Sequence, residues 1–462
     1  MLDAALRFTD KNRRHFVDEL SKLVAVPSCA FPGFPPAELT RSAKAVAELF
    51  RKVALEHVQL LSVGKSFPYV YADWLHAPGK PTVLLYAHHD VQPVGDLKKW
   101  KSPPFKATAR QGRLYGRGSA DDKAGIVVHA ASIAAYLKTA GKLPLNVKLI
   151  IEGEEEVGSE TQPEFLKKYA KLLKADVLVI ADSGNHKTGV PSMTTSLRGL
   201  VNADVTVSSC RQSLHSGMWG GPVPDPVLAL SKMLASLSDE KGFIAIPGIY
   251  RDVKPLNKVE KESYASLGYT DAVYRKQAGM LPGVSIIGGK ASPCHKMWRL
   301  PSVSVNAIVA SSKKDCANII NDSAWCRVGV RTVPNMSEEK VFKMLAAHLK
   351  KHAPWGVKVE VRKVTAGPWW GTDPSDEVFQ AAGRALTKGY GKKAAYIGTG
   401  GSIPFVGPFS KALGGAPALL VGVEDPFSNA HSENESLDLG DLQKAIRSSI
   451  HMYEELSKLK RK

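Results

Sequence analysis

The sequence predicts an α/β protein whose main sheet is covered by helices on both faces and whose chain is interrupted by a smaller α+β domain. Apolar runs typical of buried strands alternate with amphipathic helices at both ends of the chain, and strict apolar/polar alternation marks the middle. The length of 462 residues also exceeds what one hydrophobic core usually holds. We expect the α/β domain at residues 1–197 and 367–462 and the inserted domain at 198–366.

The N-terminal α/β part is expected to begin with helices at 11–24 and 37–56, where apolar residues fall on one face. Further helices are expected near 122–138 and 162–173. The apolar runs that predict buried strands are Val58–Val63, Tyr69–Trp74, Val83–Ala87, Val147–Ile151 and Val177–Ala181. In sheets of this type ligands bind beyond the carboxyl ends of the strands, so polar residues at those ends are the first candidates for a site.

The inserted domain has a different pattern. Strands with one open sheet face are expected at Val201–Val207, Trp325–Val333 and Val357–Val361, with helices near 225–237 and 337–352. Residues 238–298 have irregular polarity and are expected to form an insertion with some helix. The first pattern then returns, with a helix near 376–388, a strand at Ala416–Val423 and a terminal helix near 439–458.

Composition excludes several classes of protein. The chain is 44% hydrophobic and 23% charged, and it contains no run of eighteen apolar residues that could span a membrane. Its N-terminus has neither the basic start nor the apolar stretch of a signal peptide, so we expect a cytoplasmic protein. The five cysteines include no CxxC pair and are expected to be free thiols.

The formal net charge of +18 is high. Lysine and arginine are scattered, and no nucleic-acid-binding motif accompanies them. We therefore expect a solvated basic surface that attracts anionic substrates, and neither a nucleic acid nor a membrane as a partner.

Five short segments rich in acids and histidines carry the candidate chemistry, and most follow predicted strands. Their leading residues are His88, Asp121, Glu155, Asp182 and His431. Imidazole and carboxylate together are the donors that divalent cations such as Zn²⁺ accept. Each segment alone has a plainer interpretation, as a surface ion pair, a solvated helix face or a turn cap. Their joint occurrence favours a two-metal hydrolase.

Residue spacing suggests how these side chains divide the work. His88 and Asp90 fall on the same side of a strand, so Asp90 could hold one ring nitrogen while the other binds a cation; His89 faces the other way. Asp121 follows a Gly-Arg-Gly turn and is expected to open a helix. Its carboxylate could bridge two cations, but Asp122 is an equal candidate from the sequence.

Glu155 and Glu156 are adjacent, so their side chains point apart. That arrangement suits two duties, in which one carboxylate binds metal and the other takes a proton from a metal-bound water.

With these segments in place, the chain resembles the dinuclear zinc metallopeptidases of the aminoacylase, carboxypeptidase G and carnosinase group, in particular the carnosinase and Cys-Gly dipeptidase branch. The resemblance extends from about Leu20 to Leu456, although 238–298 contribute little. The motifs that carry it are His88-x-Asp-Val-Gln-Pro93, Trp100…Phe105, Glu152-Gly-x-Glu-Glu-x-Gly-Ser159, Gly400-Gly-Ser-Ile-Pro404 and His431-Ser-x-Asn-Glu435.

The resemblance implies a role for each candidate. Two divalent ions are expected, most often Zn²⁺, with Mn²⁺ or Co²⁺ as alternatives. The implied ligands are His88, Asp121 and Asp182 for one ion and Asp121, Glu156 and His431 for the other, with Asp121 bridging. Asp90 would orient His88, Glu155 would be the general base, and a distorted peptide bond would follow Asp121.

By the same resemblance, residues 198–366 would be a lid and dimerisation domain of a homodimer. His215 would reach into the partner subunit's site and stabilise the oxyanion, and Arg331 would hold the free carboxylate of the substrate. Asn318, Gly401 and Ser402 would add further contacts to the substrate.

We therefore expect a metal-dependent hydrolase that cleaves the amide bond of dipeptides or short peptides by a metal-bound hydroxide with a glutamate general base. An N-acyl amino acid deacylase of the deacetylase or desuccinylase type, using the same dinuclear site, is the alternative. One departure bears on this choice, since Gly398-Thr399 replaces the Arg-Glu pair that would contact a free substrate amine. A non-catalytic binding protein is disfavoured because every residue of the metal shell is present.

Overall fold

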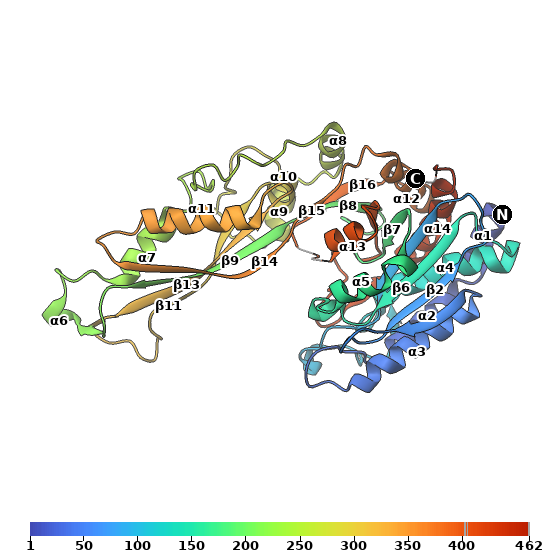
Figure 1. Cartoon of the computed structure of the whole chain (residues 1–462), viewed down its shortest axis with the longest axis horizontal. Coiled ribbons are helices and arrows are strands. Elements are labelled where there is room, and N and C mark those ends of the chain that lie inside the picture. The colour runs from blue at the N-terminus through green and yellow to red at the C-terminus, as the bar shows by residue number, and fades with distance from the viewer. Residues whose placement is uncertain (402, 404, 461–462) are drawn as a thin grey trace. The chain divides into compact units, whose positions relative to one another are not determined.

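The computed structural model of the chain describes residues 1–401, 403 and 405–460 and divides into two compact units, whose elements are labelled in Figure 1. Unit 1 comprises Met1–Thr195, Thr372–Ile397 and Phe405–Lys462. Unit 2 comprises Ser196–Gly371 and the short segment Gly398–Pro404, which the sequence-based division leaves in the α/β domain.

Unit 1 is built on a mixed sheet whose central strands are buried on both faces. In sheet order the strands are β1 (Glu56–Leu61), β2 (Tyr69–Trp74), β6 (Asn146–Glu152), β3 (Thr82–His88), β7 (Val177–Ile180), β17 (Ala418–Leu420) and β8 (Ser192–Leu197), with β16 (Ala395–Thr399) also paired to β8. Strand β3 runs parallel to both β6 and β7. Every residue of β2, β3 and β7 is buried, and for this reason these strands appear in the sequence as largely apolar runs, with Asp73 the one charged residue in β2.

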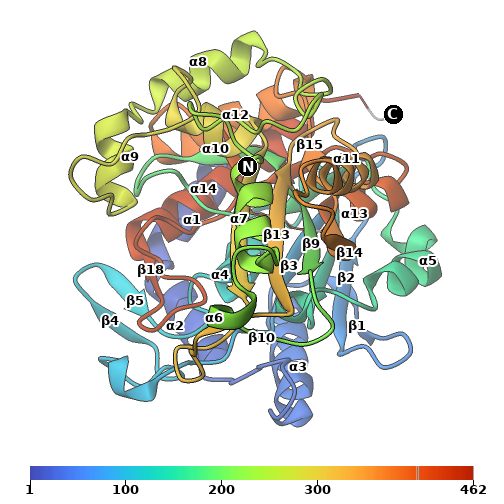
Figure 2. The same cartoon turned by 90° about the vertical axis from the view of Figure 1, so that its left-hand side faces the viewer.

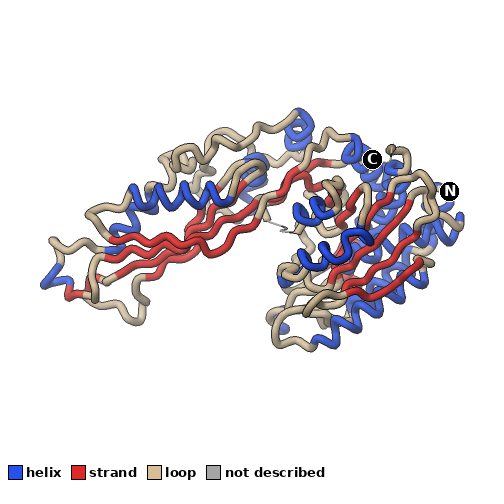
Figure 3. Tube along the Cα trace, in the orientation of Figure 1, coloured by secondary structure: helices blue, strands red, loops and turns tan. Residues whose placement is uncertain are grey.

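Helices cover both faces of this sheet (Figure 3). The group around α4 consists of α1 (Leu2–Lys11), α2 (Arg13–Val24), α3 (Pro36–Lys52), α4 (Lys123–Ala140), α12 (Glu377–Tyr390) and α14 (Leu439–Leu456). The other group is α5 (Gln162–Leu173) and α13 (Val406–Ala412), where Phe409 of α13 contacts Tyr86 of β3. Helix α4 is buried on every side along most of its length because it packs between β3 and other helices.

A small second sheet brings the C-terminal region beside an early turn. Its strands are β4 (Thr108–Arg110), β5 (Arg113–Tyr115) and β18 (Ser436–Asp438), and Ser436 pairs with Tyr115. This register places the residues that precede β18 next to the turn that follows β5. Two of the five candidate segments, separated by about three hundred residues in sequence, are thereby brought together.

Unit 2 contains a four-stranded antiparallel sheet with one covered face. The strands in order are β11 (Ser302–Val309), β13 (Ser323–Thr332), β9 (Gly199–Ser208) and β14 (Lys358–Gly367). Alternate residues of β9 and β13 form a core with α7 (Pro226–Ala235) and α11 (Glu338–Lys351). Shorter elements of this unit are β10 (Leu214–His215), α6 (Ser216–Trp219), β12 (Ile319–Ile320), β15 (Trp370–Gly371) and, in the insertion, α8 (Lys258–Ser266), α9 (Asp271–Gln277) and α10 (Pro293–Arg299).

The predicted fold class, a sheet covered by helices on both faces with a smaller α+β part, is confirmed. Several details differ from the expectation, since helices α1 and α13 and strands β8 and β16 were not predicted. Two further differences concern other strands. The strand expected at Ala416–Val423 is limited to Ala418–Leu420, and β11 was not predicted because its apolar residues are largely exposed at a sheet edge. Within the part of the chain that the structure describes, no helix combines the length and the apolar character needed to cross a membrane.

Candidate metal centre

Strand β3 delivers His88, which is completely buried, to the carboxyl edge of the main sheet. Its Nε2 lies 3.0 Å from Asp121 Oδ1 and 3.8 Å from Asp182 Oδ1. Its Nδ1 lies 3.2 Å from the main-chain oxygen of Asp90 and 3.4 Å from the Asp90 carboxylate. The ring is therefore fixed through Nδ1, and Nε2 is directed at the carboxylates, as a metal-binding tautomer requires.

The carboxylate of Asp90 also has a function that the sequence did not suggest. It accepts hydrogen bonds from the main-chain N–H groups of Glu155, at 3.2 Å, and Glu156, at 3.0 Å. Both glutamates lie in a 3₁₀ turn, η2 (Glu155–Val157), that follows β6. Asp90 thus ties the end of β3 to the turn that carries both glutamates.

Asp121 is held in place from the opposite end of the chain. The buried carboxylate of Glu435 accepts hydrogen bonds from the main-chain N–H groups of Gly118, Ala120 and Asp121, at 2.8, 2.9 and 3.1 Å. The same carboxylate pairs with the buried guanidinium of Arg117 at 2.8 Å. A single carboxylate therefore fixes the whole Gly-Arg-Gly turn that positions Asp121.

The structure separates the roles of Asp121 and Asp122, which the sequence left open. Asp121 directs Oδ1 to His88 Nε2, at 3.0 Å, and Oδ2 to His431 Nε2, at 2.9 Å. Asp122 instead accepts from the N–H groups of Gly125 and His88, at 3.2 and 3.3 Å, and caps α4. The expectation that Asp121 itself opens the helix is wrong, since the N-cap is the next residue. The peptide bond between the two aspartates is cis.

Glu156 and His431 meet Asp121 from the other side. His431 Nε2 lies 3.1 Å from Glu156 Oε2, and His431 is the most exposed member of the cluster. Glu156 is oriented by Gln92, whose main-chain N–H donates to Oε1 at 3.1 Å and whose side-chain amide donates to Oε2 at 2.7 Å. The Gln of the His-x-Asp-Val-Gln-Pro motif therefore orients a carboxylate of the cluster.

These residues form two groups of three donors with Asp121 in common. The ligand atoms of His88, Asp121 and Asp182 lie within 4.8 Å of one another, and so do those of Asp121, Glu156 and His431. Imidazole nitrogen and carboxylate oxygen are the donors that Zn²⁺ and its neighbours among the transition metals accept. The donor set and its sharing through one carboxylate fit a pair of divalent cations.

The electrostatics of the cluster also fit bound cations. Burial raises the pKa of Asp182 to about 7, against the opposing effect of His88. Burial and the charge of Asp182 raise the pKa of Glu155 well above its usual value. Hydrogen bonds to the carboxylates of Asp121 and Glu156 raise the pKa of His431 to about 11. Several buried carboxylates thus compete for too little positive charge, and divalent cations would relieve that repulsion.

Unit 2 brings two other candidates together. Strand β10, which leads into α6 (Figure 2), pairs with β12, and the N–H of Ser216 donates to the main-chain oxygen of Asn318 at 2.9 Å. His215 is exposed and its Nδ1 accepts from the N–H of Gly217 at 3.1 Å. His215 and Asn318 therefore lie side by side at one end of unit 2.

Arg331 lies in the four-stranded sheet of unit 2, near the end of β13 that is farther along the chain from β12, opposite Ser302 and Leu200. Arg198 connects this region to the Gly400 segment, since its Nε donates to Gly400 O at 3.3 Å and its Nη1 to Ser302 Oγ at 3.1 Å. Burial, followed by the charge of Arg331, lowers the pKa of Arg198 to about 10. Gly401 is exposed in this segment, and Ser402 lies outside the described residues.

Sequence reasoning missed four residues that shape the site, namely Gln92, Arg117, Glu424 and Glu435. Gln92 and Glu435 stand in motifs that had been recognised, but nothing in those motifs assigned them a contact. Glu424 follows the strand expected at Ala416–Val423, so the strand-end rule could have found it. Its main chain forms a bridge with Gly184, two residues after Asp182, and burial followed by the charges of Asp121 and Asp182 raises its pKa well above the usual value.

A mixed α/β sheet with histidines and carboxylates clustered at the carboxyl ends of its strands defines a metallohydrolase. The sequence profile of Peptidase family M20/M25/M40 matches residues 84–455. A cysteinylglycine-S-conjugate dipeptidase of Corynebacterium striatum is 33% identical, over 79% of this chain and 78% of its own. A Cys-Gly metallodipeptidase of Schizosaccharomyces pombe is 30% identical over 96% of both chains. The crystal structure of human carnosine dipeptidase 1 superposes with a TM-score of 0.78 at 26% identity, over 99% of both chains.

The chain belongs to peptidase family M20/M25/M40. The resemblance to dinuclear metallopeptidases is thereby confirmed, and so is the prediction of a metal-dependent enzyme that hydrolyses dipeptides. The alternative of an N-acyl amino acid deacylase is not favoured by these relatives.

Proposed function

We propose that the clustered side chains of unit 1 are the active site of a homodimeric dipeptidase that cleaves a single amide bond. The observation that carries the proposal is the sharing of Asp121, whose two carboxylate oxygens face different histidines. When bound, two divalent ions supply activation of water and polarisation of the amide carbonyl. His88, Asp121 and Asp182 would hold one ion, and Asp121, Glu156 and His431 the other. We propose Zn²⁺ as the native metal because both donor groups combine imidazole with carboxylate.

Glu155 is the proposed general base. It adjoins Glu156 in η2, and its main-chain N–H is anchored by Asp90, so its carboxylate is held beside the cluster while Glu156 binds metal. Glu155 takes a proton from the attacking water and then donates it to the nitrogen of the leaving amine, which balances the proton over one turnover. Its burial favours the protonated form and so supports the second of these steps.

Arg331 is proposed to bind the free carboxylate at the C-terminal end of the substrate. A guanidinium can meet a carboxylate with two parallel hydrogen bonds. Arg198 adds a second positive charge close by and holds the Gly400 carbonyl, so it positions the segment that carries Gly401. Together they form a basic patch of unit 2 that suits a terminal carboxylate.

His215 and Asn318 are proposed to act in the site of a partner subunit. Along β13, Arg331 is eight residues from Ser323, the end near β12, and an extended strand of that length spans about 25 Å. Such a distance is too long for His215 and Arg331 of one unit 2 to touch the same dipeptide. Two copies of the chain would supply the two contacts from different subunits.

The proposed substrates are dipeptides of the kind named for the relatives, Cys-Gly and β-Ala-His. Gly398-Thr399 lacks the glutamate expected to hold a substrate amine, so we propose that selection rests on the carboxyl end. All five cysteines are free, which agrees with a reducing compartment, and we propose that the enzyme works in the cytoplasm.

Replacing the base tests the chemistry. In Glu155→Gln we expect kcat for the best dipeptide to fall about 10²- to 10⁴-fold, with the metal content unchanged. The exposed Glu160, in the same loop, provides the matched control Glu160→Gln, which should keep the full rate. Full activity of Glu155→Gln with both metals bound would refute the assignment of the base. Activity on N-acetyl or N-succinyl amino acids, without any on dipeptides, would refute the substrate class.

Mixing two inactive variants tests the partner contribution. In His215→Ala we expect kcat to fall about 10²- to 10³-fold, as for loss of one oxyanion donor. Refolding His215→Ala together with Glu155→Gln would give mixed dimers with one complete site, so activity should rise well above that of either variant alone. An equal mixture that remains as inactive as its parts would contradict the proposed sharing of the site.

A further inference from the structure

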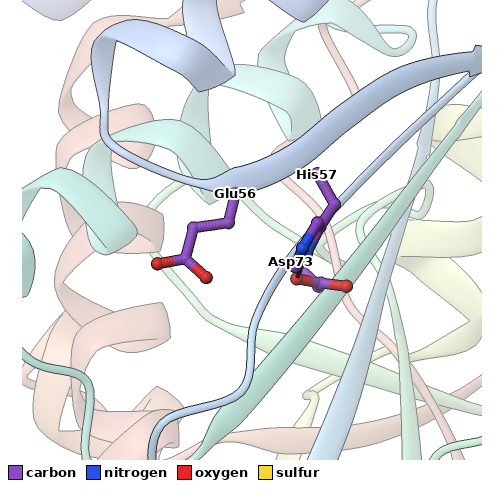
Figure 4. A group of neighbouring side chains, drawn as sticks. All are labelled: Glu56, His57 and Asp73. Atoms are coloured by element: carbon purple, nitrogen blue, oxygen red, sulfur yellow. Dashed lines mark hydrogen bonds and ion pairs between the residues drawn. The ribbon is translucent and has the colours of Figure 1, made fainter.

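A second group of histidine and carboxylate side chains lies in unit 1, away from the candidate metal centre. We propose that Glu56, His57 and Asp73 form a third divalent-cation site, selective for borderline transition metals such as Zn²⁺ (Figure 4). Each residue offers one donor atom, and these atoms lie within 4.8 Å of one another. The proposal does not depend on the dipeptidase activity.

The position of this group on the sheet separates it from the active site. Asp73 of β2 pairs with Lys148, near the amino end of β6, whereas the catalytic cluster follows the carboxyl ends of β3 and β6. Strand β1, which carries Glu56 and His57, is the edge strand of the sheet. A cation bound here would therefore contact the edge of the scaffold and not the substrate.

A local irregularity of β1 gathers the donors on one face. Successive side chains of a regular strand point to opposite faces, which would separate Glu56 from His57. The register between β1 and β2 shifts after Glu56, which pairs with Asp73, and His57 has a φ of +49°. This bulge turns His57 so that both side chains leave the strand on the same side. Figure 4 shows His57 facing Asp73, with the Glu56 carboxylate lying to one side of that pair.

The donor atoms are already oriented for a cation. His57 Nδ1 lies 2.8 Å from Asp73 Oδ1, and the other carboxylate oxygen accepts a hydrogen bond from Tyr71 OH at 2.7 Å. A hydrogen-bonded carboxylate of this kind is the usual outer support of a metal ligand. His76, after β2, lies 2.8 Å from Glu56 Oε2 and could supply a further imidazole.

The spacing matches that of the candidate metal centre. There, imidazole nitrogens lie 2.9–3.1 Å from carboxylate oxygens of Asp121 and Glu156. The nearby ammonium of Lys148, which would oppose a cation, is directed to the main-chain oxygens of Leu172 and Lys174, at 2.6 and 2.9 Å. His57 and Asp73 thus repeat one such pair at 2.8 Å, and the Lys148 ammonium is turned away, which supports binding of the same class of ion.

The exposure of the three donor side chains sets the affinity that we expect for the third cation. The side chain of Asp73 is 7% exposed, but those of His57 and Glu56 are 69% and 46% exposed. Water would complete the coordination and compete for the donors, so this third ion should bind more weakly than the two in the buried cluster.

Metal counting tests the proposal. The 462-residue protein, with its buried cluster loaded, is dialysed against buffered free Zn²⁺ rising to the solubility limit of zinc at neutral pH, and bound zinc per chain is measured by mass spectrometry. We expect one additional equivalent in the native protein and its loss in His57→Gln and Glu56→Gln. The exposed His15, outside the group, gives the control His15→Gln, which should retain that equivalent.

The measured quantity is the difference of one zinc ion between native protein and variant. This difference can be interpreted whether or not the buried cluster binds two metal ions. All these variants change exposed side chains, and thermal melting without zinc should show the same stability as the native protein. The proposal is overturned if the native protein takes up no additional equivalent, or if His57→Gln and Glu56→Gln both keep it.

Discussion

Two clusters in unit 1 use the same donors but differ in how the fold holds them. In the buried cluster, carboxylates accept main-chain N–H groups or are aligned by neighbours, as with Asp90, Glu156 and Glu435. At the sheet edge, Glu56, His57 and Asp73 are held mainly by side chains. The two clusters thus share their donor types and differ in burial and in main-chain anchoring.

Burial also creates an electrostatic cost that only one of the two clusters carries. At the sheet edge water solvates the charges. In the buried cluster, burial and then the charges of neighbouring carboxylates raise the pKa of Glu155 and Asp182, so these charges destabilise the metal-free fold. Metal binding and folding stability should therefore be linked in the buried cluster and nearly independent at the edge.

The largest effect is expected from the shared carboxylate. In Asp121→Asn both groups of donors lose their common anionic ligand, so we expect both metals to be lost. Bound ions contribute several kcal/mol to the transition state, so kcat should fall about 10³-fold or more. Asp122→Asn, at the N-cap of α4, is the matched control and should keep its metals. Retention of both ions in Asp121→Asn would contradict the assignment of Asp121 as the shared metal ligand and of Asp122 as the helix cap only.

The anchoring of the buried cluster is tested at Glu435. In Glu435→Gln the guanidinium of Arg117 stays buried without an anionic partner. Breaking such a buried pair costs about 3–5 kcal/mol, measurable by urea denaturation. The exposed pair Glu48–Lys52 offers the control Glu48→Gln, for which we expect no measurable change. Equal stability of the two variants would mean that burial does not distinguish the anchored cluster from the surface.

A smaller effect is expected from pH in the metal-free protein. Burial raises the pKa of Asp182 to about 7, well above its value of about 3.9 in an unfolded chain. The native state then binds more protons than the unfolded state between these values, so its stability should fall as pH rises from about 4 to 7. Urea denaturation of chelated protein across this range should show the fall, by a few kcal/mol at most. Protein with two bound metals should lack it, and a chelated protein that is equally stable at both ends would contradict the linkage.

The sequence predicted most of the scaffold and the residue types of the site because both follow from local patterns. Apolar runs predicted β2, β3 and β7, since strands buried on both faces are rich in apolar residues; in β2 the run is interrupted by the buried Asp73. The strand-end rule then pointed to His88, Asp182 and the adjacent glutamates. β11 escaped prediction because its position at an exposed edge leaves no burial pattern to detect.

Contacts between segments that are distant in the sequence could not be predicted from such local patterns. The choice between Asp121 and Asp122 depends on which carboxylate caps α4, and that depends on where His88 and Gly125 lie in space. The role of Glu435 arises only because β18 pairs with β5, and the bulge at His57 only because β1 shifts its register on β2.

The sequence by itself determined the fold class, the family and the donors available to a metal, because these depend on hydrophobic periodicity and on short motifs. Only the tertiary structure decided which carboxylate is shared and which are anchored by main-chain N–H groups. It also decided which histidines remain exposed, because hydrogen bonds and burial are set by residues far apart in the chain.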